Sequence, residues 1–151
     1  MRSARMSSLA RAAFLVPAFA ALAALTGRDG AAQEGRSIYA AVDAGGRRVA
    51  VGTEVSGSLS TGDLLGSDGR IQVWVLWADP GENVRVELRS DDFDAYLRVV
   101  GPGLGTGLTD DDGGDGLNSR LCFQVPEGGV TRVVASALSD GTGSFEIAVA
   151  S

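Results

Sequence analysis

The stretch Asn83-Val-Arg-Val-Glu-Leu-Arg89 alternates polar and apolar residues at every position. Successive side chains of an extended strand point to opposite faces of a sheet, so the stretch predicts one apolar face and one face in water. A strand that is half buried in this way is typical of an antiparallel sheet. The apolar face then needs a second layer to cover it.

The same two-residue period recurs on both sides of this stretch. It is clear at 144–149 and 120–125, and shorter runs lie around 55–59, 97–99 and 133–135. Segments rich in glycine, proline, aspartate and serine separate the runs and predict tight turns. No stretch after residue 33 keeps a helical apolar period for three turns. We therefore predict an all-β fold, an antiparallel β-sandwich of jelly-roll type with seven to eight strands.

The run Ile71–Trp77 is apolar on both of its faces, which predicts a central or doubly covered strand. Trp74 and Trp77 point to opposite faces of this strand, so at least one of them should lie in the core. An exposed tryptophan at this place would indicate a binding face.

The first 32 residues have the layout of a secretory signal peptide. Three arginines within residues 1–11 precede 14 uncharged residues, 12–25, and small residues surround a cleavage site after Ala32. A membrane anchor is the alternative, but the apolar run is shorter than the roughly 20 residues that a spanning helix needs. We predict a secreted or periplasmic protein with no membrane span after signal removal. A flexible lead-in, 33–48, and one domain, 49–151, would follow.

The composition excludes several classes of function. The chain contains no histidine and no lysine, which rules out serine–histidine triads, histidine metal sites and phosphate loops with a lysine. The net charge of −6 argues against a nucleic-acid partner. Asp94 and Asp112 could imitate a glycosidase pair, but a small sandwich offers little room for a cleft, and nothing in the sequence indicates a raised carboxyl pKa. We expect a protein that is not an enzyme.

The sequence also predicts the surroundings of several single side chains. Cys122 is the only cysteine, so no disulfide can form within the chain. We expect it to be a small buried apolar residue in a monomer, with a dimer-forming disulfide as the alternative. Phe93 and Leu97 should belong to the core, and Tyr96 should lie at a strand edge with its hydroxyl bonded.

Two acidic clusters, one on each side of residue 100, supply many carboxylate ligands in loops. Calcium takes six to eight oxygen ligands and tolerates irregular loops, so these clusters are candidates for a calcium site. The alternative is a solvated acidic turn whose side chains cap nearby backbone groups. Both interpretations stay open. The candidate ligands are Asp91, Asp92, Asp94, Asp110, Asp111, Asp112, Asp115 and Asn118.

A set of short motifs in a fixed order resembles the bacterial pre-peptidase C-terminal domain family over about residues 50–150. The resemblance implies a β-sandwich that is appended to secreted peptidases and is also found alone. It implies a non-catalytic module for secretion, targeting or binding, with an extracellular protein or polymer as partner; related collagen-binding sandwiches bind calcium through acidic loops. The motifs are Val55-Ser-Gly-Ser-Leu59, Ser90 with Phe93-Asp-Ala-Tyr-Leu97, Gly101-Pro102, Asp111-Asp112, Asn118-Ser-Arg-Leu121, Pro126-x-x-Gly129 and Gly141-Thr-Gly-Ser-Phe145.

The chain departs from this family pattern at two points. Residues 128–134 lack the aromatic residue that usually follows the glycine there, and no peptidase domain accompanies the sandwich in this sequence. The resemblance therefore gives no support for protease activity. A purely structural envelope or periplasmic protein without a discrete ligand remains the alternative function.

Overall fold

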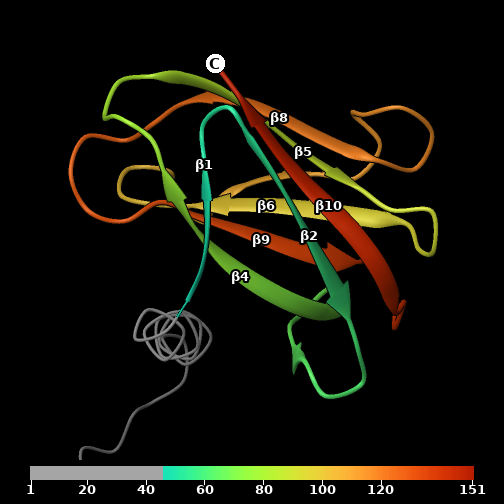
Figure 1. Ribbon diagram of the computed structural model, residues 1–151. Coiled ribbons are helices and arrows are strands. Elements are labelled where there is room, and N and C mark those ends of the chain that lie inside the picture. The colour runs from blue at the N-terminus through green and yellow to red at the C-terminus, as the bar shows by residue number, and fades with distance from the viewer. Residues whose placement is uncertain (1–45) are drawn as a thin grey trace, which may run out of the picture.

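A computed structural model describes residues 46–151, which form ten β-strands and no helix (Figure 1). The predicted signal peptide and most of the predicted lead-in lie outside these residues. Within 46–151 no helix is long and apolar enough to cross a membrane. The strands are β1 (Arg47–Ala50), β2 (Thr53–Leu59), β3 (Leu64–Leu65), β4 (Arg70–Trp77), β5 (Asn83–Arg89), β6 (Ala95–Val100), β7 (Leu108–Asp110), β8 (Ser119–Gln124), β9 (Arg132–Ala137) and β10 (Gly143–Ala150).

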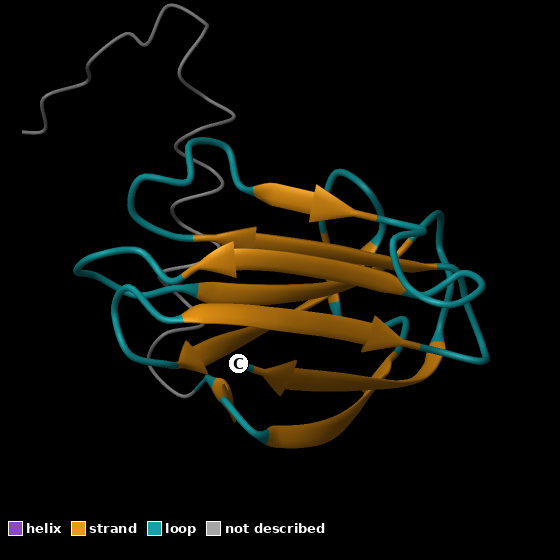
Figure 2. Cartoon of the chain, turned by 90° about the horizontal axis from the view of Figure 1, so that it is seen from above, coloured by secondary structure: helices purple, strands orange, loops and turns teal. Residues whose placement is uncertain are grey.

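The strands form two sheets that face each other, seen edge-on in Figure 2. Sheet A has the order β1-β4-β9-β6-β7, with β3 also paired to β4, and sheet B has the order β2-β10-β5-β8. Every strand pair is antiparallel except β1 with β4. The predicted antiparallel sandwich is confirmed.

The described chain has more strands than the seven or eight predicted. The two residues of β3 and the three of β7 are too short to show a period in the sequence. Arg47 and Arg48, which were expected in the lead-in, instead open β1, where backbone pairing with β4 holds them. Pairing with a partner strand, rather than local apolar pattern, makes these short segments β-structure.

The core lies between the two sheets and is built from the predicted alternating residues. Val84, Val86 and Leu88 of β5 are buried, as are Phe145, Ile147 and Val149 of the neighbouring β10. Complete burial of such a side chain stabilises the fold by roughly 1.5–3 kcal/mol before entropy is counted. The strand that decides the fold class in the sequence is therefore also a central strand of sheet B.

Strand β4 is buried on both faces, as its sequence predicted. Trp74 and Leu76 point into the main core, whereas Ile71 and Val73 belong to a smaller apolar cluster with Val134 of β9. The two tryptophans differ strongly, because Trp74 is 6% exposed and Trp77 is 58% exposed.

The aromatic expectations for residues 93–97 hold in part. Leu97 is fully buried, and Phe93 packs partly buried with its ring edge against Phe145, at 6.4 Å between ring centroids. Tyr96 does not lie at a sheet edge, because β6 has β9 on one side and β7 on the other. Its ring faces Arg98, whose guanidinium carbon lies 6.0 Å from the ring centroid.

The prediction that Cys122 is buried is wrong, because the thiol is exposed. Strand β8 is an edge strand of sheet B, and its neighbours Leu121 and Phe123 pack against the core. Since alternate residues point to opposite faces, Cys122 must then point away from the core. The general tendency of free cysteines to be buried gives way here to strand alternation.

Loops lie at the two ends of the sandwich (Figures 1 and 2), and the two sets differ in composition. The acidic end, made by loops 60–69, 90–94, 111–118 and 138–142, contains nine aspartates and no arginine. The apolar end, made by loops 51–52, 78–82, 101–107 and 125–131, contains Pro80, Pro102 and Pro126, all the prolines of the described chain. Candidate sites at the two ends must therefore differ in chemistry.

Candidate functional site

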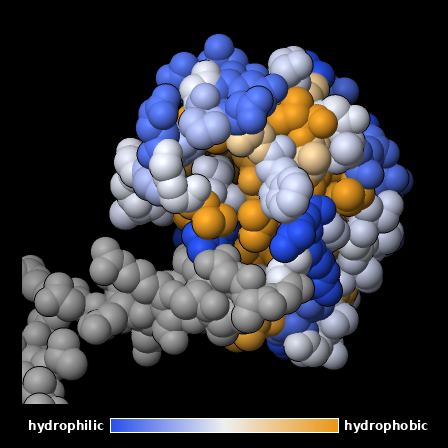
Figure 3. All heavy atoms as spheres, turned by 60° about the vertical axis from the view of Figure 1, so that its left-hand side comes forward, coloured by the Kyte–Doolittle hydropathy of each residue, from blue (hydrophilic) through white to orange (hydrophobic). Residues whose placement is uncertain are grey.

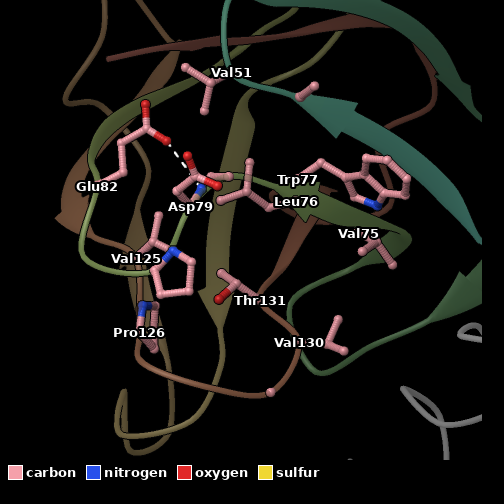
Figure 4. A pocket seen from close by; sticks show the side chains of 14 residues that line it. Val51, Val75, Leu76, Trp77, Asp79, Glu82, Val125, Pro126, Val130 and Thr131 are labelled. Atoms are coloured by element: carbon pink, nitrogen blue, oxygen red, sulfur yellow. Dashed lines mark hydrogen bonds between the residues drawn. The ribbon is translucent and has the colours of Figure 1, made fainter.

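The apolar end contains a groove of about 660 Å³ around the end of β4. This volume lies within the range of sites that bind small molecules or peptide side chains. In Figure 4, Trp77 and Val75 lie on one side of the strand end, and Glu82, Val125 and Pro126 lie on the other. Figure 3 shows apolar surface exposed at this end between hydrophilic residues.

Backbone hydrogen bonds join the segments that line the groove. Gly81 N–H donates to Val125 O at 2.9 Å, and Val125 N–H donates to Glu82 O at 2.8 Å. Leu76 N–H donates to Thr131 O at 2.9 Å on the opposite wall. These bonds hold the groove in its shape before any ligand arrives, which lowers the entropy cost of binding.

The prolines fix the loops of the apolar end further. A proline ring locks one backbone angle and so removes conformational freedom from the loop. Pro102 also lies close against Gly129, where an added Cβ would come within 2.5 Å of the proline Cγ. The loops 101–107 and 125–131 therefore pack tightly against each other beside the groove.

Trp77 is the aromatic side chain that lines the groove, and it is 58% exposed. The guanidinium carbon of Arg48 lies 5.0 Å from the centroid of its ring. The attraction between a cation and an indole face at this distance is worth about 0.5–1 kcal/mol at an exposed site. The neighbouring strand thus orients an exposed tryptophan at the rim of an apolar groove.

The groove carries charges of opposite sign at its two sides. Asp79 and Glu82 line the loop side, where the Glu82 carboxylate accepts a hydrogen bond from Asp79 N–H at 3.2 Å. Arg48 stands beside Trp77 on the sheet side. Among these residues, only Trp77 was predicted from the sequence to mark a binding face. The three prolines in the loops were the one further sequence signal that could have located the groove, because prolines mark preformed loops.

At the acidic end the predicted calcium ligands fall into three groups. Three of them cap backbone groups of other segments: Asp92 accepts from Ser144 N–H at 2.7 Å, Asp110 from Arg120 N–H at 2.8 Å, and Asn118 from Ser90 N–H at 3.0 Å. The Asp111 carboxylate caps its neighbour, Asp112 N–H, at 3.0 Å. The hydroxyl and backbone hydrogen bonds from Ser144 hold the pKa of Asp92 below its usual value. The capping interpretation is confirmed for these four residues.

Asp91 and Asp115 point towards solvent in the same loops. Asp91 is exposed beside a shallow pocket, and the Asp115 side chain is 99% exposed. The nearest approach of Asp115 to a cation is 4.0 Å, from Arg120.

Asp94, Asp111 and Asp112 are the candidates that the fold brings near one another. The Ser119 hydroxyl donates to Ala95 O at 2.6 Å and to Asp111 O at 3.1 Å, which fastens the 111–118 loop beside Asp94. Burial, and then the charges of Asp112 and Asp111, raise the pKa of Asp94. Nothing in the sequence indicated this raised pKa of Asp94, because it depends on a contact between distant loops.

These three residues match part of what a calcium site needs. One carboxylate oxygen of Asp94, Oδ1, is buried and has no hydrogen-bond partner in the described chain. A cation would neutralise the repulsion among the three carboxylates. Residues 46–151 nevertheless contain no group of three or more histidine, cysteine, aspartate or glutamate side chains arranged to hold a metal ion. Calcium binding by these residues stays a prediction.

Melting curves with calcium and with a chelator test the prediction of calcium binding. At ten times the dissociation constant, calcium would add ~1.4 kcal/mol to the free energy of unfolding. The melting temperature should then rise by several degrees in millimolar calcium and return on chelation. Identical curves would leave the acidic end as a set of capped turns.

The single variant Asp94→Asn distinguishes a calcium site from a set of capped acidic turns. A carboxyl whose folded pKa is raised costs stability above that pKa, and costs none below the unfolded value of 3.8. In chelator at pH 7, Asp94→Asn should therefore raise the melting temperature, and the gain should disappear below pH 3.8. If calcium binds, the same variant should also lose its calcium response. A lower melting temperature in chelator would contradict the assigned repulsion.

Fold and groove together define a class: an all-β sandwich module with an open groove between the loops of one end. No protein-family model and no curated protein matches the sequence. Among solved structures, the chain is similar to the pre-peptidase C-terminal domain of a collagenase from Bacillus anthracis. That match has 14% sequence identity and a TM-score of 0.53, and covers 68% of this chain and 92% of that domain. The predicted resemblance is thereby confirmed at the level of the fold.

Two further similar structures are PliG from Salmonella Typhimurium and PliG from Aeromonas hydrophila, periplasmic inhibitors of g-type lysozyme. Each is 16% identical, with TM-scores of 0.43 and 0.44. They cover 69% and 68% of this chain and 98% and 97% of their own. At these identities the likeness concerns the fold alone.

Proposed function

We propose that the protein is a secreted or periplasmic, non-catalytic binding module whose partner docks at the groove around Trp77. The observation that carries the proposal is the exposure of Trp77, which is 58% exposed at the groove rim while Trp74 of the same strand is buried. Large exposed aromatic residues are enriched where proteins bind one another. The signal-peptide pattern of residues 1–32 supports export.

The chemistry of the groove supports binding rather than catalysis. Its carboxylates are Asp79 and Glu82, and the second of these is engaged with backbone N–H. The chain has no histidine or lysine to act as a base. An apolar floor with a tryptophan anchor offers burial and shape, which are the requirements of a recognition site.

Trp77→Ala tests this function directly. The purified protein is immobilised and used to capture exported proteins and cell-envelope polymers from its host. Truncating an aromatic side chain that a partner covers costs about 2 kcal/mol of binding energy, so we expect the captured partner to be lost. Because Trp77 is exposed, the melting temperature should change little.

Leu117→Ala is the matched control, because Leu117 is also 58% exposed but lies at the acidic end. The control should retain whatever wild type captures. A partner retained equally by Trp77→Ala would contradict the proposed site. Capture of nothing by wild type would favour the alternative, a structural envelope protein without a discrete ligand.

A further inference from the structure

The loops of the apolar end carry charge of one sign. They contain three carboxylates, Asp79, Glu82 and Glu127, and no arginine. Within residues 46–151 none of the three forms an ion pair, whereas the glutamates on the outward face of sheet B are paired with arginines. The apolar end therefore presents negative charge that these loops do not balance.

Backbone hydrogen bonds gather these carboxylates beside the groove. Glu82 N–H donates to Asp79 O at 3.0 Å, which closes a tight turn, and the backbone of Val125 bonds to this turn. An added Cβ at Gly81 would lie 3.6 Å from a carboxylate oxygen of Glu127, so the Glu127 side chain lies against the same turn. Asp79 and Glu82 line the groove, and Glu127 lines a second hollow of about 370 Å³ that shares Val125 with it. The negative charge is therefore concentrated on the loop side of the groove.

The other side of the groove offers apolar contacts instead. Trp77 and Val130 are 58% and 41% exposed, and Figure 4 shows them on the side away from Glu82. The guanidinium of Arg48 already lies over the Trp77 ring. Because like charges repel, Arg48 disfavours a second cation on this ring. An incoming cation is therefore directed to the loop side, and an apolar group to Trp77.

We propose that the groove binds an extended segment of a partner protein in which one residue separates an arginine from an apolar residue. This inference rests on the proposed function and adds the chemical class of the partner. The guanidinium of the segment pairs with the carboxylates of Asp79 and Glu82, whose geometry its planar fork matches. Side chains two residues apart in an extended segment point to the same face, so the apolar side chain is directed to Trp77 and Val130. Charge complementarity selects this segment over an acidic one.

The test uses three synthetic peptides of equal length, labelled for fluorescence anisotropy and mixed with the purified protein. The first repeats arginine-serine-leucine-serine, which puts arginine and leucine on one face. The second repeats arginine-leucine-serine-serine, which has the same composition but puts them on opposite faces. The third repeats glutamate-serine-leucine-serine. We expect the first peptide to bind, with an affinity that falls as salt is raised, and the other two to bind at least tenfold more weakly.

Asp79→Asn should weaken the complex with the first peptide by about threefold, and the double variant with Glu82→Gln by about tenfold. Glutamine keeps an oxygen that can accept from Asp79 N–H, so the turn should stay closed. Asp140→Asn is the matched control, because it also removes the charge of an exposed aspartate but lies at the acidic end. It should leave the affinity unchanged. Equal loss in Asp79→Asn and Asp140→Asn would show general charge attraction and overturn the proposal.

The remaining outcomes are equally decisive. No binding of the first peptide, equal binding of the second, or tighter binding of the third overturns the proposed partner class. If the double variant captures the same host partner as wild type while Trp77→Ala loses it, the binding module stands and this inference alone falls. A dimer in solution that Trp77→Ala dissociates would show that a second copy occupies the groove, which also overturns the proposal.

Discussion

Replacing Phe145 with alanine should lower the free energy of unfolding by about 3–5 kcal/mol. The ring is 2% exposed, and it makes edge contacts with Trp74 and Phe93, each at 6.4 Å between ring centroids. It joins β10 of sheet B to a tryptophan of sheet A, so its loss leaves a cavity between the layers. A typical domain has only 5–15 kcal/mol of stability in total, so the variant should be marginal. Urea unfolding measures the change.

A second substitution, at Gly57, tests the same contact from the other side, because Gly57 of β2 lies directly opposite Phe145. A Cβ added at Gly57 would come within 2.3 Å of the ring, so Gly57→Ala should destabilise the wild-type protein. In the Phe145→Ala background the same change enters vacated space and should be neutral or stabilising. The double-mutant cycle should therefore show strong coupling. Additive losses would mean that the ring does not fill the space above Gly57.

Gly69→Ala should be the most damaging of the small substitutions at the acidic end, with a loss of several kcal/mol. Gly69 has a φ of 137°, a conformation that side chains disfavour. An added Cβ would lie 2.2 Å from Ser139 O and 2.3 Å from Ala137 O. Both are backbone atoms, so the start of β4 or the end of β9 must move to admit a methyl group. Circular dichroism melting and urea unfolding report the loss.

Gly103→Ala is the control for the backbone cost alone. Gly103 also has a positive φ, 76°, but an added Cβ there would meet nothing within 4 Å. Its loss should be about 1–2 kcal/mol, the usual cost of a side chain in that conformation. If Gly69→Ala costs no more than Gly103→Ala, the close approach of β4 to Ser139 is contradicted.

Under the proposed function, the acidic end of the sandwich contributes stability and the apolar end contributes recognition. At the acidic end, carboxylates such as Asp92 and Asp110 satisfy backbone N–H groups and join loops that are distant in the sequence. At the apolar end, proline-bearing loops hold a groove open beside Trp77. Binding variants should therefore be sought at the apolar end, and stability variants at the acidic end and in the core.

Strand alternation predicted the fold class because it is a local property. Residues 83–89 and 144–149 each carry their apolar face in their own period, and both lie in the core where that period puts them. The same logic separated Trp74 from Trp77. Alternation also places Cys122 on the outward face, and the prediction for this residue failed because the general tendency of free cysteines was preferred to it.

The sequence by itself determined the two-layer architecture, the core residues, the supply of acidic and proline-rich loops, and the absence of histidine and lysine chemistry. Only the tertiary structure decided which loops meet: Asp94 with Asp111 and Asp112 at one end, and the segments around the groove at the other. The reason is that a strand's faces follow from neighbouring residues, whereas loop neighbours follow from the order of strands in each sheet. That order, with β1 parallel to β4 and β9 between β4 and β6, depends on pairings between distant segments that no local pattern records.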